Sequence, residues 1–402
     1  MPLRHRLDAL RREAGAGVPA PRTQDDALRR RLQRLNRRPG HTGASGGKQP
    51  ASPDALAATL RGRIIDEHLI LLERQWCLSE RHGRFPLEVA TGSAHPIADL
   101  SPSSAYLDTE TTGLAGGTGT VAFMVALGEV GARTVRLRQW LITAFAGERP
   151  MLEQVARTLA AAECVVTYNG AAFDLPLLRD RYRLICGGAL PEVNHLDLLH
   201  TVRRLFRQGW QDCRLATAEE NLLEFRRRGD LPGSEAPGAW RAYLAGDPAH
   251  RLAEVTRHNA LDVLSLISLP PILARAVSAP REYGASPRAA AATWHKAGLP
   301  DKALQILEGS RHTLDARSAL ELARHLRAAN RFNEAVTIWQ DLARAGNPEA
   351  TEHLAKFQEH VRKDIAAALA LTRHLPDTRQ TRHRKTRLQR RATEPMQLSL
   401  GL

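Results

Sequence analysis

The sequence predicts an α/β fold in which helices flank a mixed sheet, followed by an all-α region of helical repeats. Three observations predict it. Three strand-like segments follow one another between residues 104 and 142, short apolar strands then alternate with helices, and the chain beyond residue 285 is rich in alanine with helical spacing. A chain of 402 residues is also long enough to bury a large core in about two domains.

The sheet is predicted strand by strand between residues 99 and 280. Its first three strands form a meander, because glycine-containing turns separate them, and the third strand alternates apolar and polar residues. Helices and strands then alternate. The predicted strands are residues 104–110, 120–130, 133–142, 163–168 and 192–198, the last of which leads into LLHTVRRLF. The predicted helices are 148–162, 173–185 and a long helix that includes 257–266.

The residues before the sheet fall into two segments. Residues 54–75 have the apolar spacing of a helix, so residues 51–98 are predicted to be a helical extension that packs on the main domain. Residues 1–50 combine arginine-rich stretches with glycine and proline and contain few large apolar side chains. They are predicted to be a disordered basic arm.

The positive charge of the chain is concentrated near its two ends. The formal net charge is +14, to which residues 1–50 contribute +8 and residues 373–391 contribute +7. Residues 51–372 hold 37 basic and 37 acidic side chains. Residues 376–402 are therefore predicted to be a second disordered basic tail. Two cationic arms around a neutral body favour attraction to nucleic acid or another anionic surface over tails that only aid solubility.

Composition argues against several classes of protein. The chain has no run of about 18 apolar residues, so no membrane span is expected. Its first residues lack the apolar segment of a secretory signal, and its four cysteines are scattered without a CxxC pair. A disulfide framework is therefore not expected, and the cytoplasm is the expected location.

An internal repeat is visible in the alanine-rich region. Residues 297–309 align with residues 329–341 at an offset of 32, and residues 362–374 are a weaker third copy. Helical hairpins of about 34 residues are typical of tetratricopeptide repeats, so residues 285–375 are predicted to form such repeats and to bind protein partners. An ordinary alanine-rich bundle is the alternative. A small residue would allow close helix packing in each copy: Ala303, Ala335 and Ala367.

The strongest chemical signal is the segment DTETTGL at residues 108–114. An apolar strand delivers two acids, Asp108 and Glu110, whose side chains share one face because they are two residues apart. Two carboxylates on a buried edge repel each other, which raises the pKa of at least one of them unless a cation lies between them. Oxygen ligands suit Mg²⁺ or Mn²⁺, so a divalent-metal site is predicted here.

Two further segments place acids at helical positions. YNGAAFDLPLL at residues 168–178 begins a helix at Asp174, where the helix dipole favours an ionised acid. In RHNALDVLSL at residues 257–266, His258 and Asp262 lie on one helix face. Histidine titrates near neutral pH, so it can take a proton from water while Asp262 holds a metal. Taken alone, each segment is better explained as a helix cap or a surface pair.

Together, the three segments resemble the exonuclease motifs of the DEDD superfamily, which has a ribonuclease H-like fold. Their order is DxE, NxxxFD and HxxxD. Over residues 60–280 the sequence is similar to the bacterial YprB-type family, whose members often carry tetratricopeptide-like C-termini. The similarity rests on LDTETTGLAGGTGTVAFMVALGE, YNGAAFDLPLL, LDLLHTVRRLF, CRLATAEENLL, DLPGSEAPGAWRAYL and RHNALDVLSLISL.

The resemblance implies a role for each motif residue. Two Mg²⁺ or Mn²⁺ ions would be held by four acids: Asp108, Glu110, Asp174 and Asp262. The ions would activate water and stabilise the leaving 3′ oxygen. His258 would be the general base, although its spacing of four from Asp262 is that of the tyrosine subclass of the superfamily. Asn169 and Phe173 would shape the motif around Asp174.

Other candidate site residues have simpler explanations. Asp197 follows a strand, where a structural cap or hydrogen-bond anchor is favoured over a catalytic part. His195 and His200 flank it without a cysteine, which argues against zinc. The glycine-rich residues 116–120 lack the lysine and the spacing of a nucleotide-binding loop. Three aromatic residues are compatible both with base stacking and with core packing: Trp210, Trp240 and Tyr243.

The last six residues, QLSLGL, resemble the QLxLxL peptide that bacterial replication and repair proteins insert into the DNA sliding clamp. Gln397 would make polar contacts, while Leu398, Leu400 and Leu402 would fill apolar pockets. Apolar residues after a cationic tail are unexpected unless a partner buries them. The alternative is a tail that docks on its own domain.

These features predict a divalent-metal-dependent 3′–5′ exonuclease that acts on nucleic acid. DNA is slightly favoured over RNA through the clamp-like peptide, which would tether the enzyme in DNA repair or replication. An RNA exonuclease is one alternative. A non-catalytic nucleic-acid-binding scaffold that recruits protein partners is the other, but such a module does not need four converging acids.

Overall fold

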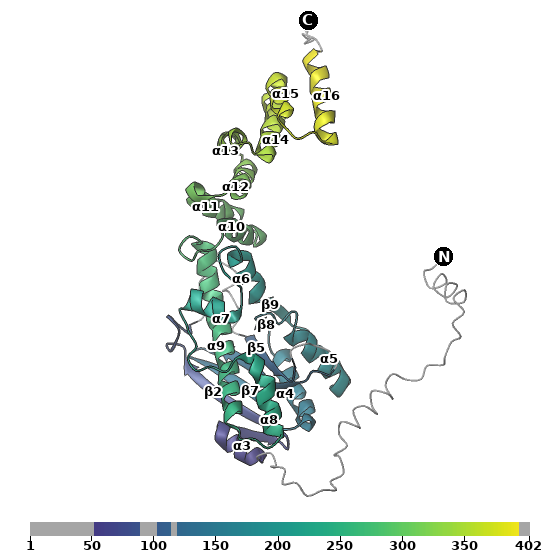
Figure 1. Cartoon of the computed structure of the whole chain (residues 1–402). Coiled ribbons are helices and arrows are strands. Elements are labelled where there is room, and N and C mark those ends of the chain that lie inside the picture. Colours follow the sequence, from purple (N-terminus) through teal and green to yellow (C-terminus); the bar gives the residue numbers. More distant parts are fainter. Residues whose placement is uncertain (1–51, 89–102, 114–118, 394–402) are drawn as a thin grey trace, which may run out of the picture. The chain divides into compact units, whose positions relative to one another are not determined.

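The computed structural model of the chain describes residues 52–88, 103–113 and 119–393 (Figure 1). All of these belong to one contact-defined unit, Gln49–Leu402. The predicted basic arm at 1–50 lies outside the described residues. The clamp-like peptide at 397–402 also lies outside them.

A seven-stranded mixed sheet forms the centre of the fold, with the strand order β1-β2-β7-β6-β5-β8-β9. β8 pairs in parallel with β5 and with β9, whereas the other neighbours are antiparallel. The predicted mixed α/β sheet is therefore confirmed, including the meander β5-β6-β7. The strands are β1 (Arg63–Asp66), β2 (Leu69–Cys77), β5 (Ser104–Thr111), β6 (Ala122–Val130), β7 (Thr134–Ile142), β8 (Cys164–Thr167) and β9 (Asn194–Asp197).

The prediction of a helical extension at 51–98 is wrong for most of its described part. Only α3 (Pro53–Leu60) is helical, and β1, β2 and a small hairpin of β3 (Arg81–His82) and β4 (Phe85–Pro86) follow it. The chain leaves the helix at Gly62, where a Cβ atom would lie 2.6 Å from Ile70. A run of four apolar residues fits a buried strand as well as a helix. All four residues of Leu69–Leu72 are buried, and β2 pairs with β7 along its whole length.

Apolar side chains project from both faces of the sheet and pack in two clusters. Tyr106 of β5 belongs to a cluster with residues of α6 and α9, whereas its neighbour Leu107 belongs to a second cluster with residues of α4, α5 and α8. This alternation is the period of a strand buried on both faces. The helices of this part are α4 (Glu148–Ala160), α5 (Asp174–Cys186), α6 (Leu198–Phe206), α7 (Leu215–Ala218), α8 (Ala236–Leu244) and α9 (His250–Ser278).

Helix α9 is the long helix predicted to include residues 257–266. Among the described residues, it is the one helix long and apolar enough to cross a membrane by length and composition. Its most apolar stretch is 83% buried inside the fold. The apolarity of α9 is thus explained by its packing against the sheet and against the helices that follow.

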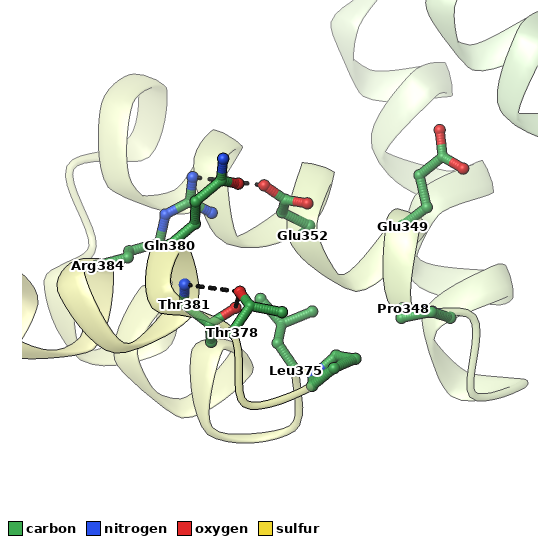
Figure 2. A pocket seen from close by; sticks show the side chains of 9 residues that line it. Pro348, Glu349, Glu352, Leu375, Thr378, Gln380, Thr381 and Arg384 are labelled. Atoms are coloured by element: carbon green, nitrogen blue, oxygen red, sulfur yellow. Dashed lines mark hydrogen bonds and ion pairs between the residues drawn. The ribbon is translucent and has the colours of Figure 1, made fainter.

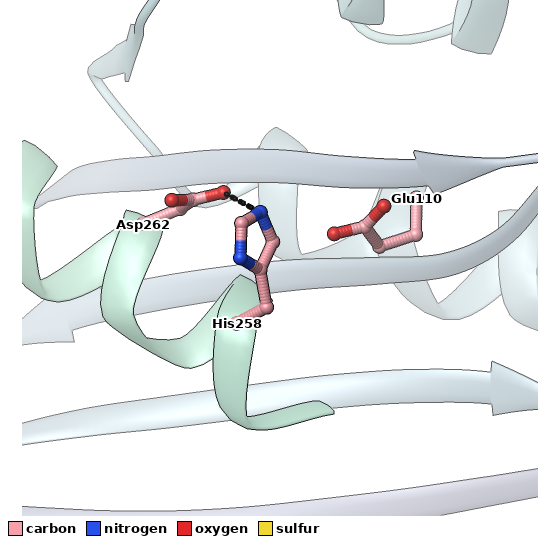
Figure 3. Close-up of side chains that lie close together, drawn as sticks. All are labelled: Glu110, His258 and Asp262. Atoms are coloured by element: carbon pink, nitrogen blue, oxygen red, sulfur yellow. Dashed lines mark ion pairs between the residues drawn. The ribbon is translucent and has the colours of Figure 1, made fainter. Parts of the chain in front are cut away.

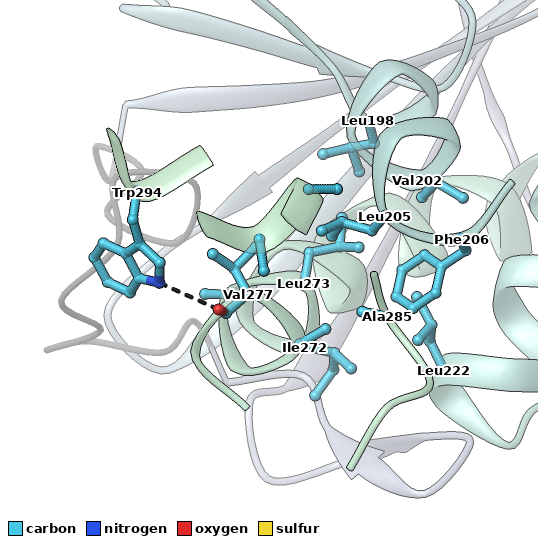
Figure 4. Close-up of a cluster of buried hydrophobic side chains, with 14 of the residues drawn as sticks. Leu198, Val202, Leu205, Phe206, Leu222, Ile272, Leu273, Val277, Ala285 and Trp294 are labelled. Carbon is cyan, nitrogen blue, oxygen red and sulfur yellow. Dashed lines mark hydrogen bonds between the residues drawn. The ribbon is translucent and has the colours of Figure 1, made fainter. Parts of the chain in front are cut away.

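Seven helices follow α9 within the described residues. They pack in succession, α10 on α11, α12 on α13 and α14 on α15. The apolar cluster continues into them, and Figure 4 shows Trp294 of α10 donating its indole N–H to the carbonyl of Val277 at 3.1 Å. The helices are α10 (Pro287–Lys296), α11 (Pro300–Gly309), α12 (Ala316–Ala328), α13 (Phe332–Arg344), α14 (Pro348–Phe357), α15 (Ile365–Arg373) and α16 (Arg379–Thr393).

The repeated alanine is the fourth residue of α11 and of α13. Ala303 and Ala335 are both fully buried there, as predicted. In the third copy the fully buried fourth residue is Ala368, and Ala367 is only partly buried. The spacing thus lengthens by one residue in this copy. That these hairpins are tetratricopeptide repeats, and that a domain boundary lies near residues 280–285, remain predictions.

The predicted disordered tail at 376–402 is wrong for its described part, because α16 occupies most of it and packs against α15. Leu388 on the inner face of α16 is fully buried. Arg387 and Arg391 on the same face pair with Glu359, whose side chain is 1% exposed. Acids outside α16 therefore neutralise one side of this helix, whose positive side chains would otherwise repel one another.

A cavity of about 280 Å³ lies between the N-terminal parts of α14 and α16 (Figure 2). Arg384 of α16 faces Glu352 of α14 there, at 3.6 Å. The first turn of α16 is capped by Thr378, whose hydroxyl accepts the backbone N–H of Thr381 at 3.1 Å. The cavity is therefore lined by one ion pair of α16 and by its N-terminal cap.

Candidate active site

Strand β5 and helix α9 bring the first and third motifs together. Asn259 of α9 donates a hydrogen bond to Oδ2 of Asp108 at 2.7 Å. Close approach of the helix is possible because β6 has Gly128 beneath it, where a Cβ atom would lie 2.5 Å from Val263. Asp108 shares the strand face of Tyr106, which packs among residues of α9.

Glu110, His258 and Asp262 form the tightest group of possible ligands within the described part of the chain. One donor atom from each lies within 4.8 Å of the others. Figure 3 shows the carboxylate of Glu110, from the strand, directed towards His258 and Asp262 on the helix. The structure thus brings together two motifs that are about 150 residues apart in sequence, as Asn259 and Asp108 also are.

Asp174 joins the group from the second motif, at the first turn of α5. Thr109 of β5 donates its hydroxyl to Oδ1 of Asp174 at 2.5 Å, and Asp174 is 9% exposed. β8 is parallel to β5, so the loop that follows β8 emerges at the same edge of the sheet as the acids of β5. This parallel pairing is why Asp174 reaches the site.

The loop between β8 and α5 is held by Asp197. Its carboxylate accepts the backbone N–H groups of Asn169 at 2.8 Å and Ala171 at 3.0 Å, and it also caps α6 through Leu199 at 3.0 Å. Asp197 is therefore a hydrogen-bond anchor, the explanation favoured from sequence. Asn169 adopts a left-handed φ of 69° in this loop.

The side chain of Phe173, at the N-cap position of α5 directly before Asp174, is 55% exposed, and its part in shaping the motif remains a prediction. The other aromatic candidates pack in the core. Trp240 is 1% and Tyr243 2% exposed, and Trp210 stacks on Phe206 with ring centroids 4.3 Å apart. Nε2 of His195 on β9 lies 2.8 Å from the hydroxyl of Thr167 on the neighbouring strand β8.

The acids of the site raise one another's pKa. Burial, followed by the charges of Asp262, Asp174 and Glu110, raises the pKa of Asp108 well above its ordinary value, although the hydrogen bond from Asn259 opposes this. Burial and the charges of Asp262 and Asp174 likewise raise the pKa of Glu110. Burial raises the pKa of Asp174 to about 6. A divalent cation would relieve this conflict, and the donors present are the carboxylate oxygens that Mg²⁺ and Mn²⁺ prefer.

His258 is oriented by an acid outside the three exonuclease motifs. Its Nδ1 lies 2.6 Å from Oδ2 of Asp230 and 3.1 Å from Nη1 of Arg227, and its Nε2 lies 3.5 Å from Oδ2 of Asp262. The carboxylate of Asp230 is the nearer partner of Nδ1 and favours the tautomer with its proton on Nδ1, which leaves Nε2 as an acceptor on the side of Asp262. Gly233 packs on that side, since a Cβ atom there would lie 3.2 Å from Nε2.

Arg227 is the charged residue that sequence reasoning missed. Its guanidinium forks onto Glu219, with Nε at 2.8 Å and Nη2 at 2.6 Å, and it also pairs with Asp262 and Asp230. Burial works against the charge, but the hydrogen bonds that Arg227 donates to Glu219 and the charge of Asp262 outweigh it and raise the pKa of Arg227. Three arginines stand in a row at 226–228, and nothing in that run indicates which one is buried.

A buried hydrogen-bond chain connects Arg227 to the β3–β4 hairpin. Ser265 of α9 donates to Glu219 at 2.5 Å, and His82 of β3 lies 2.7 Å from the same hydroxyl. Because the hydroxyl proton goes to Glu219, His82 donates to Ser265 as a neutral ring. Burial and the nearby charge of Arg227 lower the pKa of His82 to about 4.

Comparisons with known proteins fit this arrangement. A model of the RNase_H superfamily matches residues 105–273. The chain is 34% identical over 330 residues to the YprB protein of Bacillus subtilis (strain 168). The aligned region covers 76% of this chain and 79% of the relative. The family B DNA polymerase of the hyperthermophilic archaeon Pyrobaculum calidifontis matches 57% of this chain with 15% identity and a TM-score of 0.36, too low for a functional argument. The chain spans only 29% of that polymerase. By its similarity over most of both lengths, the chain belongs to the YprB family, with an RNase H superfamily domain that contains the acids described above.

Proposed function

We propose that the protein is a divalent-metal-dependent 3′–5′ exonuclease that hydrolyses phosphodiester bonds of nucleic acid. One observation carries the proposal: acids from three separate segments meet at one edge of the sheet of an RNase H superfamily domain, with His258 beside them. Buried carboxylates that raise one another's pKa are costly for stability and are typical of functional sites. The 3′–5′ polarity comes from the resemblance of the three motifs to the DEDD superfamily.

Four acids are proposed to hold the metal: Asp108, Glu110, Asp174 and Asp262. When bound, a pair of such ions supplies an activated nucleophile and stabilises the leaving 3′ oxygen of an in-line displacement. The tightest donor group described, Glu110 with His258 and Asp262, also allows His258 to be a ligand rather than the base.

The residues around the acids are proposed to fix their positions. Thr109 holds Asp174, Asn259 holds Asp108, and Arg227 holds Asp262. Asp230 keeps Nε2 of His258 free to accept the proton of an attacking water. Long-range attraction of the anionic substrate is left to the cationic ends of the chain, since residues 51–372 are balanced in charge.

The decisive assay uses purified protein with Mg²⁺ or Mn²⁺ on 5′-end-labelled single-stranded DNA, double-stranded DNA and RNA. A ladder that shortens from the 3′ end is expected for wild type and not for Asp108→Ala. Asp247→Ala, which removes an exposed acid of α8's C-terminal turn, is the matched control and should behave as wild type. If wild type and Asp108→Ala behave alike on every substrate, the enzyme proposal is wrong.

A non-catalytic scaffold is the rival, because the helices α10–α16 offer a large surface for protein partners. A scaffold would bind nucleic acid equally well after the four acids are changed to Asn or Gln, and would not respond to metal. For the peptide at 397–402 we propose docking to a sliding clamp. Leu400→Ala should weaken retention on immobilised clamp, whereas equal retention of wild type and variant would remove that idea.

A further inference from the structure

A second cavity, of about 440 Å³, lies beside the candidate active site. Its lining includes Tyr168 and Asn169, which follow β8, and Leu199, which follows β9. β5, β8 and β9 run in parallel, so their carboxyl ends lie at one edge of the sheet. The acids of β5 and this cavity therefore lie along the same edge of the sheet. Neighbouring strands are about 5 Å apart, so the two strand spacings from β5 to β9 correspond to about 10 Å.

The wall of the cavity is apolar and fixed. The hydroxyl of Tyr168 donates to the carbonyl of Cys213 at 2.7 Å, which holds the ring against the segment that follows α6. Leu199, which is 3% exposed, and Leu215 also line the cavity. The loop residue Asn169 is held by Asp197, so the cavity and the loop that carries Asp174 share one anchor.

The rim of the cavity carries two exposed arginines and one acid, Asp212. Arg203 of α6 is exposed, and it has no ion pair with any residue in the described ranges. Arg214 is 84% exposed and lies 3.7 Å from Asp212. One carboxylate oxygen of Asp212 accepts the hydroxyl of Thr217 at 2.5 Å and the backbone N–H of Arg214 at 3.0 Å, and its other oxygen pairs with Nε of Arg214. The guanidinium of Arg203 and the Nη groups of Arg214, which take no part in its ion pair, are thus available to an anion at this place.

We propose that this cavity binds the phosphodiester group on the 5′ side of the one that is cleaved, with Arg203 and Arg214 as its charged contacts. This inference rests on the proposed function and extends it to the strand that enters the site. Guanidinium groups match the geometry of phosphate oxygens, and the ring of Tyr168 gives the adjoining sugar and base an apolar wall. The substrate implied is a strand with at least two phosphodiester groups near its 3′ end.

The test compares Arg203→Ala/Arg214→Ala with the matched control Arg183→Ala/Arg204→Ala, which removes two exposed arginines outside the cavity. One substrate is a single-stranded oligodeoxynucleotide. The other is the p-nitrophenyl ester of thymidine 5′-monophosphate, which has one phosphodiester and no neighbour. For the oligonucleotide, the cavity variant should raise KM about 10- to 100-fold with kcat nearly unchanged. The dependence of log affinity on log salt should become less steep by about 1.

On the p-nitrophenyl ester, the cavity variant should match wild type. The inference is overturned if both double variants have the same KM on the oligonucleotide, in which case the nuclease proposal still stands. It is also overturned if the cavity variant loses as much on the ester as on the oligonucleotide, because the arginines would then act on the cleaved group itself. If wild type cleaves neither substrate and binds no oligonucleotide, the proposed function fails first.

Discussion

Nδ1 of His258 lies 2.6 Å from the carboxylate of Asp230, a residue that belongs to none of the three motifs. The two are 28 positions apart, and the turn that contains Asp230 and Gly233 packs on the imidazole. A carboxylate in this place holds an imidazole in one tautomer and one orientation, whichever role its other nitrogen has.

Asp230→Ala should lower kcat by about 10- to 100-fold, because His258 loses the partner that orients it. Asp230→Asn keeps an acceptor for Nδ1–H, so its loss should be smaller. KM for an oligonucleotide should change little in both. Steady-state kinetics on a labelled single strand measures this, with Asp247→Asn as the control. Wild-type turnover in Asp230→Ala would contradict the orienting role.

The acid cluster should cost stability when no metal is bound. The folded-state pKa of Asp174 is raised to about 6, so the folded chain holds this proton more tightly than the unfolded chain does. Its contribution to the free energy of unfolding therefore falls as pH rises from about 4 through about 6. In EDTA at pH 7.5, Asp174→Asn should melt about 2–4 °C above wild type, and the gap should shrink at pH 5.

Addition of Mg²⁺ or Mn²⁺ at pH 7.5 should raise the Tm of wild type more than that of Asp174→Asn. Differential scanning calorimetry at both pH values, with and without metal, provides the measurement. A wild type more stable than Asp174→Asn in EDTA at pH 7.5 would show that Thr109 and the helix dipole outweigh burial.

His82 should give a pH dependence of the opposite sign. Its pKa is lowered to about 4 in the folded chain, so the neutral ring is favoured there. Its contribution to stability is present above about pH 6.5 and is lost as pH falls towards 4. Urea unfolding of His82→Gln should be less sensitive to the step from pH 7 to pH 5 than that of wild type. His383→Gln, at an exposed position, serves as the control and should keep the wild-type sensitivity.

The segment before the RNase H match is part of the sheet, so its core residues should be needed for folding. Ile70 of β2 is fully buried, and Ile70→Ala should lower the free energy of unfolding by about 2–4 kcal/mol. Ile64 of β1 is only partly buried, and Ile64→Ala should cost about 1 kcal/mol or less. Equal effects of the two substitutions would mean that β2 does not pair with β7 in solution.

Glu359 should decide whether α16 stays docked. Glu359→Ala leaves Arg387 and Arg391 without their partner on the inner face, so α16 should detach more often. Trypsin should then cut within residues 379–391 at least about 10-fold faster while the rest of the chain stays intact. Glu349→Ala, which removes an exposed acid of α14, should leave the cleavage rate unchanged. A rate equal to wild type in Glu359→Ala would show that Leu388 alone holds the helix.

The sequence by itself determined the strands β5 to β9, the helices between them and the candidate acids. These features follow from local spacing: Asp108 and Glu110 share a strand face, and His258 and Asp262 share a helix face. The order of the motifs along the chain was enough to indicate the superfamily, without any knowledge of how the segments meet.

Only the tertiary structure decided what surrounds those acids. The run Leu69–Leu72 fits a helix or a buried strand, and pairing with β7 selects the strand. Arg227 and Asp230 reach the site from a polar stretch in which several charged residues are locally equivalent. The basic run of α16 is helical because Glu352 and Glu359, on other elements, neutralise its inner face. In each case the deciding partner is distant in sequence, so local pattern carries no information about it.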